Sequence, residues 1–350
     1  MNRWEWRVLI QPHPDYHLFF ILLAIVGAFL LGGIIMAITG HDPYSIYSQM
    51  FKGVFGSRYG LAETTVKAIP LIITGLGIAL AFRLRIWNIG GEGQLYMGAF
   101  AATFIVLCFP CLPSQIVLPS MFLAGLIAGG LWALLPAIPR VLWGVNEILT
   151  TLMLNYVAIS WVDYLVYGPW KDPAGYNFPL TPLFPSIATL PVIGNTRIHN
   201  GLHLALILVL LFHVLYKYSR WGYEARITGE SVDAAHYAGI NVRRQILISM
   251  FLSGALCGLA GMTEVSGITH RLQHGISPGY GYTAIIVAWL ARLHPLAIVP
   301  VAFLFAALQV GGYLVQTTGV PAAVAGMLQG IILFFVLGGE MLSQYRFRKI

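Results

Sequence analysis

Long apolar runs alternate with short polar stretches along almost the whole chain. An α-helix needs about 20 mostly apolar residues to cross the roughly 30 Å of hydrocarbon in a bilayer. The runs that reach or approach this length are residues 17–38, 62–82, 86–107, 115–138, 144–167, 202–215, 246–265, 296–314 and 322–337. One more run, residues 283–293, is too short to cross, so we expect a half-helix or a helix that begins in the residues before it. The pattern predicts an all-α polytopic membrane protein with about ten transmembrane helices, or eight if the short helices merge.

The composition agrees with this pattern. Of the 350 residues, 58% are hydrophobic and only 9% are charged, whereas a soluble domain carries about a quarter charged residues. We therefore expect the whole chain, residues 1–350, to form one transmembrane domain. Residues 40–59 are predicted to be a polar loop, and residues 168–200, rich in Pro, Tyr and Asn, an exterior loop. The polar first 16 residues and the long first apolar run indicate that no cleavable signal peptide is present.

The positive charges predict the orientation. Lys and Arg are scattered at the ends of the apolar runs rather than clustered on one face, which argues against nucleic-acid binding despite a net charge of +7. If ten spans leave both termini in the cytoplasm, 14 of the 20 Lys and Arg lie on the inner side. The six that lie on the outer side or at its border are Lys52, Arg58, Lys67, Lys171, Arg197 and Arg271. This bias follows the positive-inside rule and places residues 228–241 on the cytoplasmic face.

Residues 228–241 form one of the few polar stretches in the chain. Thr228 can cap the start of a helix and Gly239 can close it, which leaves about two turns, too few to be stable alone in water. Ala234 and Ala235 leave one side nearly flat, so another backbone can approach closely. We interpret the stretch as a docking helix that is held in place by what it touches. The alternative is an ordinary polar loop between two spans.

Polar residues at the beginning of the run at 86–107 are costly in lipid. Asn88, Glu92 and Gln94 stand there among several glycines. We expect this element to lie inside the helical bundle, near a pore or its inner gate. The alternative is a polar helix start at the membrane surface.

A second set of polar residues lies in the run at 144–167. Asn146 and Glu147 begin it, and Glu147, Thr151 and Asn155 follow one another at intervals of one helical turn, so these three share a face. A polar stripe on an apolar helix faces either a water-filled path or another helix. We expect these four residues to line a substrate path, with hydrogen bonding between helices as the alternative.

Several catalytic signatures are missing from the sequence. No Lys follows a Gly, so there is no Walker A phosphate loop, and neither Gly-x-Ser-x-Gly nor His-Glu-x-x-His occurs. His270 and His274 lie four residues apart without a glutamate between them, so we expect no metal site there. Cys108 and Cys111 are separated by two residues, and the sequence leaves open whether they form a disulfide with each other. We predict that the chain is not an enzyme and that any ATP is bound by another chain.

The polar stretch matches the pattern Glu-x-x-x-Ala-Ala-x-x-x-Gly-Ile-Asn, which resembles the cytoplasmic "EAA" loop of ABC-importer permeases. The matching residues are Glu230, Ala234, Ala235, Gly239, Ile240 and Asn241. Residues 82–99 and 144–156 resemble the segment after the second span and the fifth span of permeases that import branched-chain amino acids, simple sugars and nucleosides. The amino-acid sequences of these two segments are most similar to those of the nucleoside-uptake branch. The loop departs from the simplest form of the motif at residues 231–233, which leaves the contact residues open.

The resemblance implies a fold, a set of partners and a mechanism. The implied fold is the type II, vitamin B12-importer-like arrangement in the cell (inner, cytoplasmic) membrane. The implied partners are an ABC ATPase that binds ATP and Mg, a second permease chain, expected to be a different paralogue, and an extracytoplasmic solute-binding lipoprotein. The motif residues would couple to the ATPase, and the chain itself would bind no cofactor.

The cargo is expected to be a small neutral polar solute, most plausibly a nucleoside, that moves inward by alternating access. It is expected to be neutral because the predicted spans hold no cluster of charges of one sign. The alternatives are the same machinery for simple sugars or branched-chain amino acids, or an ion-coupled secondary transporter. The sequence leaves open whether two identical or two different permease chains pair.

Overall fold

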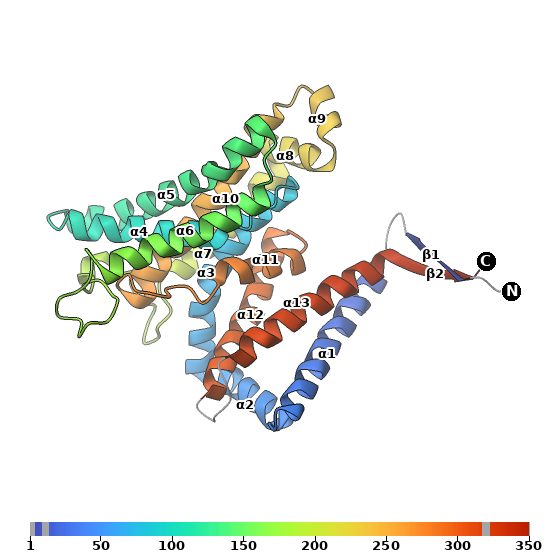
Figure 1. Ribbon diagram of the computed structural model, residues 1–350, viewed down its shortest axis with the longest axis horizontal. Helices are drawn as coiled ribbons and strands as arrows, with labels where there is room; N and C mark the ends of the chain where they lie inside the picture. Colours follow the sequence, from blue (N-terminus) through green and yellow to red (C-terminus); the bar gives the residue numbers. More distant parts are fainter. Residues whose placement is uncertain (1–3, 9–13, 317–322, 350) are drawn as a thin grey trace. The chain divides into compact units, whose positions relative to one another are not determined.

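The computed structural model describes residues 4–8, 14–316 and 323–349, and nearly all of the regular structure in them is helical (Figure 1). The expected beginning of the last span, Ala322, lies outside the described residues. The chain divides into two compact units, Met1–Leu61 with Ala307–Ile350, and Ala62–Ala306.

The first unit brings the two ends of the chain together. Strand β1 (Trp4–Val8) pairs antiparallel with β2 (Tyr345–Lys349), with Trp4 opposite Lys349 and Val8 opposite Tyr345 (Figure 1). Helix α1 (Pro14–Ile38) packs against α13 (Ala323–Gln344). The sequence analysis did not foresee the two strands.

Residues 40–59, expected to be a polar loop, contain helix α2 (Pro43–Phe55) instead. The helix forms because Asp42 caps it, accepting hydrogen bonds from the backbone N–H groups of Tyr44 and Ser45, and Pro43 suits the first turn. Its buried face consists of residues at a four-residue interval that join a core with the end of α1 and with α13. The members of this core are Met36, Ile46, Met50, Val315 and Leu328.

The second unit holds most of α3 (Arg58–Arg83) and the first half of α12 (Pro295–Val315). Between them lie α4 (Gly91–Cys108), α5 (Ser114–Trp143), α6 (Glu147–Tyr167), the short η1 (Ser186–Ala188), α7 (Gly201–Tyr218), α8 (Arg220–Glu230), α9 (Val232–Tyr237), α10 (Val242–Glu264), the π-turn η2 (Val265–Thr269) and α11 (Tyr280–Leu290). Among the described residues, six helices are long and apolar enough to cross a membrane: α3, α5, α6, α7, α10 with its π-turn, and α12.

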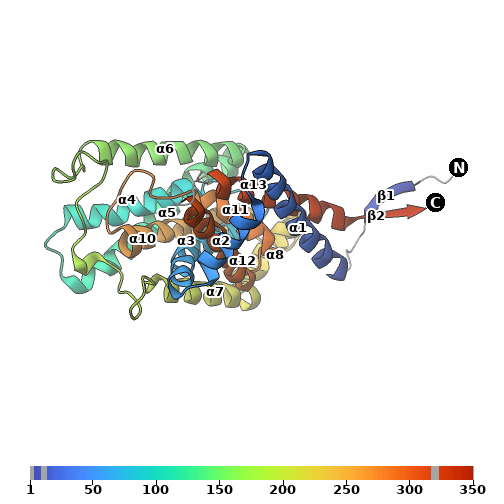
Figure 2. The same ribbon diagram turned by 90° about the horizontal axis from the view of Figure 1, so that it is seen from below.

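Glycines let α4, α5 and α10 approach one another closely at the centre of the second unit. A Cβ atom on Gly98 would overlap the backbone of Gly258, and a Cβ atom on Gly129 would overlap the carbonyl oxygen of Gly254. These contacts leave no room for any side chain larger than hydrogen. Small residues of the spans at 115–138 and 246–265 therefore meet in the structure. Figure 2 shows α4, α5 and α10 between α6 and α7, which lie at opposite margins of this unit.

Two elements begin later or earlier than the apolar pattern indicates. Residues 86–90 are not helical, so α4 begins at Gly91 rather than at residue 86, because the Asn88 side chain accepts a hydrogen bond from the backbone N–H of Gly90. Helix α11 begins at Tyr280, where Ser277 Oγ accepts from the backbone N–H of Tyr280 at 3.0 Å. The expected half-helix therefore extends into the preceding residues and has only 11 residues.

The segment at 168–200 is mainly irregular and is anchored by backbone pairing. Thr181 and Phe184 donate to the carbonyl oxygens of Leu272 and His270, at 2.9 and 2.8 Å. The segment therefore packs on the connection between η2 and α11.

Candidate functional site

The polar stretch at 228–241 is built differently from the single helix expected. Thr228 lies inside α8, where its hydroxyl donates to the Glu224 carbonyl at 2.8 Å, so it does not cap a helix. The cap of the next helix, α9, is Ser231, whose Oγ accepts from the backbone N–H of Ala234. Gly239 follows α9 with φ +71°, a left-handed conformation that glycine adopts without strain and that closes the helix as the sequence predicts.

The six motif residues divide into two groups. Ala235 and Ile240 are buried and form a small core with Val242, Ile227 and Ile246. Their role in the structure is to fix α9 on the rest of the unit. The other motif residues are exposed: Glu230, Ala234, Gly239 and Asn241. Of these, Asn241 caps α10 by accepting from the backbone N–H of Arg244 at 3.0 Å.

The exposed side of α9 carries apolar side chains that the motif does not include. Tyr237 is 94% exposed and Val232 is 51% exposed. Large apolar side chains exposed on a polar projection indicate a contact surface for another protein. The signal that could have revealed Tyr237 is its place two residues after Ala235 on a short helix, which puts it on the side opposite Ala235.

Helix α8 is bonded to the ends of three long helices. Glu224 accepts from Arg220 at 2.7 Å and from Gln245 of α10 at 2.5 Å. The hydrogen bond from Arg220 is the main reason that the pKa of Glu224 lies below its ordinary value. Arg226 donates to the backbone of Tyr216 in α7 at 3.3 Å. A displacement of α8 is therefore transmitted to α7 and α10.

The third connection of α8 is with the end of α3. A Cβ atom on Gly229 would overlap the carbonyl oxygen of Arg83, so the two backbones are in direct contact. The Arg83 guanidinium lies 4.1 Å above the ring of Tyr216 and donates to the Leu293 carbonyl at 2.9 Å, in the turn before α12. One arginine thus joins α3, α7 and the α11–α12 turn beneath the projection.

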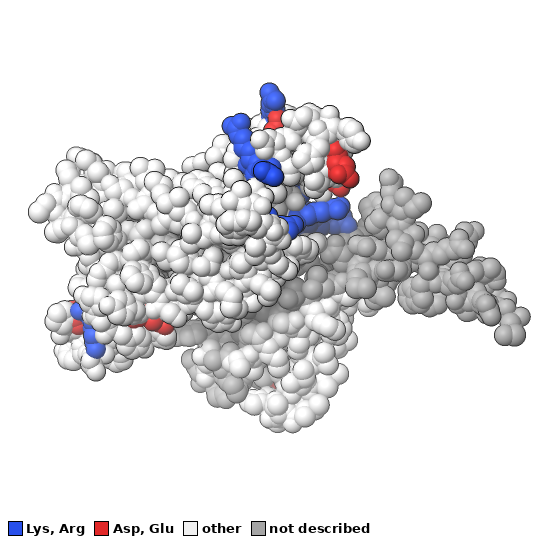
Figure 3. Space-filling view, turned by 45° about the horizontal axis from the view of Figure 1, so that its top comes forward, with Lys and Arg blue, Asp and Glu red and all other residues white. Residues whose placement is uncertain are grey.

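Charge gathers at this projection. Figure 3 shows blue and red side chains where Figure 1 places α8 and α9 and a second group at the lower left, whereas the flank between the two groups is almost entirely uncharged. The exposed basic residues at the projection are Lys217, Arg220, Arg226, Arg243 and Arg244. Charge that is absent from the flank and present on either side of it is the distribution expected of a membrane domain.

The polar residues at the start of α4 form one buried hydrogen-bonded group. Asn88 donates to Gln94 Oε1 at 3.0 Å and to Ser253 Oγ of α10 at 2.9 Å, and Gln94 donates back to Asn88 Oδ1 at 2.9 Å. Glu92 is also buried, and its Oε2 accepts from the backbone N–H of Gly281 at 2.6 Å. These residues join α4 to α10 and to α11.

The stripe on α6 faces this same group. Asn155 is fully buried: its Oδ1 accepts from the Gly93 N–H at 2.8 Å, and its Nδ2 donates to the Ile89 carbonyl at 2.9 Å and to the Tyr282 hydroxyl at 3.3 Å. Thr151 accepts from the Ile89 N–H at 3.3 Å. Side chains of α6 therefore satisfy backbone groups of the non-helical residues before α4, as a membrane interior requires of irregular backbone.

The remaining two predicted residues of α6 lie at its first turn. Asn146 is the exposed cap and accepts from the Ile148 N–H at 2.9 Å. Glu147 is buried, 3.2 Å from Arg140 Nε, and accepts from the Trp87 N–H at 3.4 Å. The structure therefore brings Asn88, Gln94, Thr151 and Asn155 into one region, with Glu92 and Glu147 at its margins, and leaves Asn146 outside.

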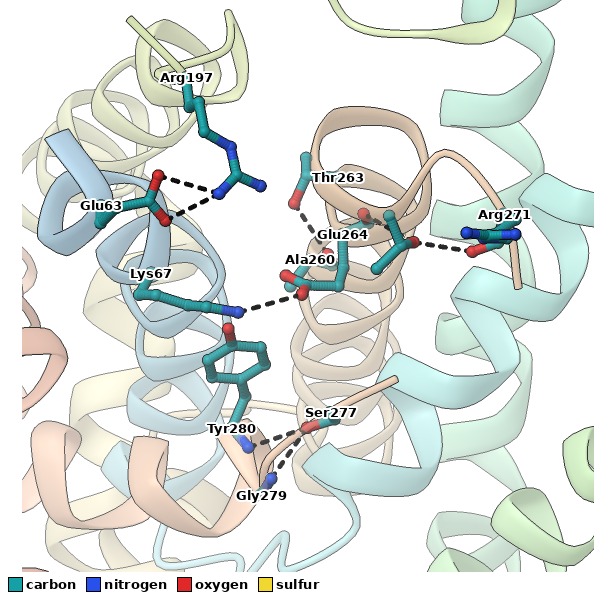
Figure 4. Close-up of polar contacts among 11 residues, drawn as sticks. Glu63, Lys67, Arg197, Ala260, Thr263, Glu264, Arg271, Ser277, Gly279 and Tyr280 are labelled. Carbon is teal, nitrogen blue, oxygen red and sulfur yellow. Dashed lines mark hydrogen bonds and ion pairs between the residues drawn. The ribbon is translucent and has the colours of Figure 1, made fainter. Parts of the chain in front are cut away.

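A third polar group lies at the other end of α3 and α10, and the sequence analysis missed it. Lys67 Nζ lies 3.6 Å from Glu264 Oε1 and 5.6 Å from the centre of the Tyr280 ring (Figure 4). Glu264 is 2% exposed, and nearby Glu63 binds Arg197 at 3.0 Å. Only the structure reveals this ion pair, because its members come from helices far apart in sequence.

Metal and disulfide chemistry can be assessed for the described part of the chain. No group of three or more His, Cys, Asp or Glu side chains in those residues is arranged to hold a metal ion. His274 pairs with Asp163 at 2.8 Å instead. Cys108 and Cys111 are both free and exposed, and Cys257 is free and buried.

Comparison with known proteins gives the class. Residues 60–337 match the family described as "Branched-chain amino acid transport system / permease component", and the chain belongs to this family. It is 36% identical over 337 residues to the glucose ABC transporter permease protein TsgB13 of Haloferax volcanii, covering 93% of this chain and 88% of that one. It is 33% identical over 324 residues to the guanosine ABC transporter permease protein NupP of Bacillus subtilis, covering 91% and 93%. It is 30% identical over 324 residues to the nucleoside ABC transporter permease protein NupB of Lactococcus lactis, covering 90% and 89%.

These findings confirm the class predicted from the three motifs. The chain is a multi-pass membrane permease of the ABC-transporter type, and as a permease component it is not itself an enzyme.

Proposed function

We propose that this permease imports a nucleoside, driven by a separate ATPase subunit that docks on α8 and α9. The observation that carries the proposal is the construction of the α8–α9 projection. Its outer side is free and exposes Tyr237 and Glu230, whereas its inner side is bonded to α3, α7 and α10. A partner that moves this projection moves three long helices of the permease.

The topology that supports this proposal has ten spans and both termini in the cytoplasm. We count α1, α3 to α7 and α10 to α13 as the ten spans; six of these helices in the described residues are long and apolar enough to cross a membrane, and α11 has only 11 residues. With an inner N-terminus this order puts α8 and α9 inside and residues 168–200 outside. The pairing of β1 with β2 favours both ends on the same side of the membrane. We propose the type II arrangement, with the whole chain as one permease domain in the inner membrane.

The partners follow from the same proposal. ATP and Mg would bind the ATPase subunit, and a second permease chain, a different paralogue, would supply the other wall of the solute path. An extracytoplasmic lipoprotein would deliver the solute. Within this chain, Asn88, Glu92, Gln94, Glu147, Thr151 and Asn155 would act at the gate, since their hydrogen bonds fix the non-helical residues before α4. Asn146 would act only by capping α6.

Two features support a neutral, nucleoside-like cargo. Lys67 with Glu264 and Arg140 with Glu147 form ion pairs, and the buried Glu92 accepts a hydrogen bond from the Gly281 N–H. These five side chains therefore present no cluster of free charge of one sign that would select an ion. The guanosine and nucleoside permeases that resemble this chain favour nucleosides, and the glucose permease makes a sugar the second candidate. Competition of radiolabelled uridine uptake by unlabelled nucleosides and sugars separates the two.

Gly239 offers a test of coupling with a matched control. Gly239→Val places a β-branched residue at φ +71°, which should distort the end of α9 and lower both ATP-driven uptake and the amount of ATPase that co-purifies by at least fivefold. Gly239→Asn, which tolerates this conformation, should retain most of both. Normal uptake and normal ATPase recovery with the valine variant would refute the coupling role of α9.

A further inference from the structure

The outward face of α6 carries a row of hydroxyl groups. Tyr156, Ser160 and Tyr164 follow at intervals of four residues, and all three are exposed, the two tyrosines to 59% and 61%. With Val157 and Trp161, which belong to the same helix, they line a shallow and widely open groove. The row lies on the side of α6 opposite the buried Thr151 and Asn155.

The depth of this row in the membrane makes contact with lipid unfavourable. Helix α6 has 21 residues, and at about 1.5 Å per residue it spans the hydrocarbon with little to spare. Tyr156 is the tenth of these residues, so it lies near the middle of the bilayer. Tyrosine is favoured at the membrane surface, and an exposed hydroxyl in the hydrocarbon has no hydrogen-bond partner. The face therefore fits a hydrated path better than it fits lipid.

Two other helices at the surface of the second unit show what a lipid-facing side looks like in this protein. In the middle of α5 and of α7, the exposed side chains are aliphatic. Representative members are Ile127, Leu131 and Leu135 on α5, and Ile207, Leu210 and Val214 on α7. The aromatic and hydroxyl character of the α6 face is thus a local departure from the rule that its neighbours follow.

We propose that this face of α6 lines the solute path and binds a nucleoside, with the base against the aromatic rings and the ribose on the hydroxyls. The proposal rests on the proposed function. The Trp161 and Tyr164 rings lie 5.9 Å apart and are tilted by only 30°, so together they offer a nearly continuous aromatic surface. Planar bases stack on such surfaces whichever base it is, because every base has an aromatic face.

The hydroxyl row accounts for the other half of a nucleoside. Tyr156 and Ser160 each provide one donor and acceptor that can exchange hydrogen bonds with ribose hydroxyls. The Asp163 carboxylate on the same helix pairs with His274 at 2.8 Å rather than entering the groove, so the lining is uncharged. An uncharged lining suits a neutral nucleoside and disfavours a nucleotide.

Uptake kinetics test the role of the hydroxyls. In cells that contain the complete importer, Tyr156→Phe should raise KM for radiolabelled uridine about threefold to tenfold, the loss expected for one hydrogen bond. Trp161→Leu should raise KM for uridine more than KM for radiolabelled ribose or glucose. Tyr218→Phe, at an exposed tyrosine at the end of α7, is the matched control and should leave KM unchanged. Unchanged kinetics in both α6 variants would overturn the proposal.

Thiol labelling tests whether water reaches the groove. In a Cys108→Ser, Cys111→Ser background, which removes both exposed native thiols, Ser160→Cys should react with a water-soluble maleimide, and uridine should slow the reaction. Leu210→Cys on the aliphatic face of α7 should stay unreactive. A Ser160→Cys thiol that stays unlabelled with and without ATP indicates lipid contact, and one that is labelled at the same rate with and without uridine indicates a hydrated surface outside the solute path. Either result overturns the proposal.

The two levels of inference can fail separately. If the chain co-purifies with an ATPase and takes up uridine but the α6 variants behave as wild type, only the assignment of this face is wrong. If uptake is insensitive to nucleosides while Ser160→Cys is labelled and protected by a sugar, the proposed cargo is wrong. A variant that loses uptake is informative only if the ATPase still co-purifies, which serves as the assembly control.

Discussion

The two faces of α6 carry polar side chains in opposite states. On the inner face, Thr151 and Asn155 are fully buried, and they exchange hydrogen bonds with the backbone at Ile89 and Gly93. On the outer face, Tyr156 and Ser160 are exposed in a groove. The comparison teaches that a polar residue in an apolar helix does not by itself mark a solute path. Its partners do, because a side chain that already satisfies a neighbouring backbone cannot also bind a solute without disrupting the fold.

The adjacent residues Asn155 and Tyr156 provide the sharpest test of this difference. Asn155→Leu should destabilise the protein by about 3 kcal/mol or more, because the Gly93 N–H and the Ile89 carbonyl lose their partner while they stay buried. Tyr156→Leu should leave stability nearly unchanged and reduce transport. The midpoint of thermal unfolding of the purified complex measures the first effect, and uptake measures the second.

The comparison fails if the two variants behave alike. Equal unfolding midpoints would mean that the Asn155 contacts contribute little to the fold. In that case the inner face would be as free to take part in transport as the outer face. The interpretation that Thr151 and Asn155 line the substrate path would then be favoured over the interpretation that they act at the gate by fixing the residues before α4.

His199 is an intermediate case, since it is buried but only half paired. Its Nδ1 accepts from the Gly201 N–H at 3.2 Å, whereas its Nε2 has no partner, and the ring fills the space beside Gly201 and Gly267. Burial, with a smaller repulsion from His270, lowers the pKa of His199 to about 4 from 6.5. The folded chain therefore binds this proton less readily than the unfolded chain.

The sign of the resulting pH dependence follows directly. The stability that depends on neutral His199 is fully present above pH 6.5, and it is lost as the pH falls toward 4, by about 3 kcal/mol in total. Unfolding midpoints at pH 7.5 and pH 4.5 should differ more for the wild type than for His199→Phe, which cannot titrate. Equal differences for the two proteins would show that His199 is already protonated or solvated in the fold.

Much of the fold could be predicted from the sequence because the apolar runs are long. The positions of α3, α5, α10 and α12 follow from hydropathy, and the family was predicted correctly from three motifs. Helix α2 was missed although Asp42 and Pro43 are an adequate start signal, because the expected loop was inferred from its polar composition alone. The strands at the two termini could not be predicted, since each has its partner at the other end of the chain.

The site was predictable in part. The spacing of Glu147, Thr151 and Asn155 correctly placed them on one face, but spacing on one helix cannot reveal what that face contacts. The same four-residue interval joins Tyr156 to Ser160, and the sequence analysis did not single out these two hydroxyl residues. The ion pair of Lys67 with Glu264 illustrates the general limit. The spacing of residues along one helix does not identify their partners on another helix.

Two small hydroxyl residues give the finest version of the comparison. Thr151→Val removes an acceptor for the buried Ile89 N–H at the same side-chain volume, so it should cost about 1–2 kcal/mol of stability. Ser160→Ala removes an exposed hydroxyl and should change stability by less than about 0.5 kcal/mol. Denaturant or thermal unfolding in the same detergent compares the two directly. A larger loss of stability for Ser160→Ala than for Thr151→Val would mean that the outer hydroxyl is bonded in the assembled protein, and the outer face of α6 would then be a packing surface like the inner one.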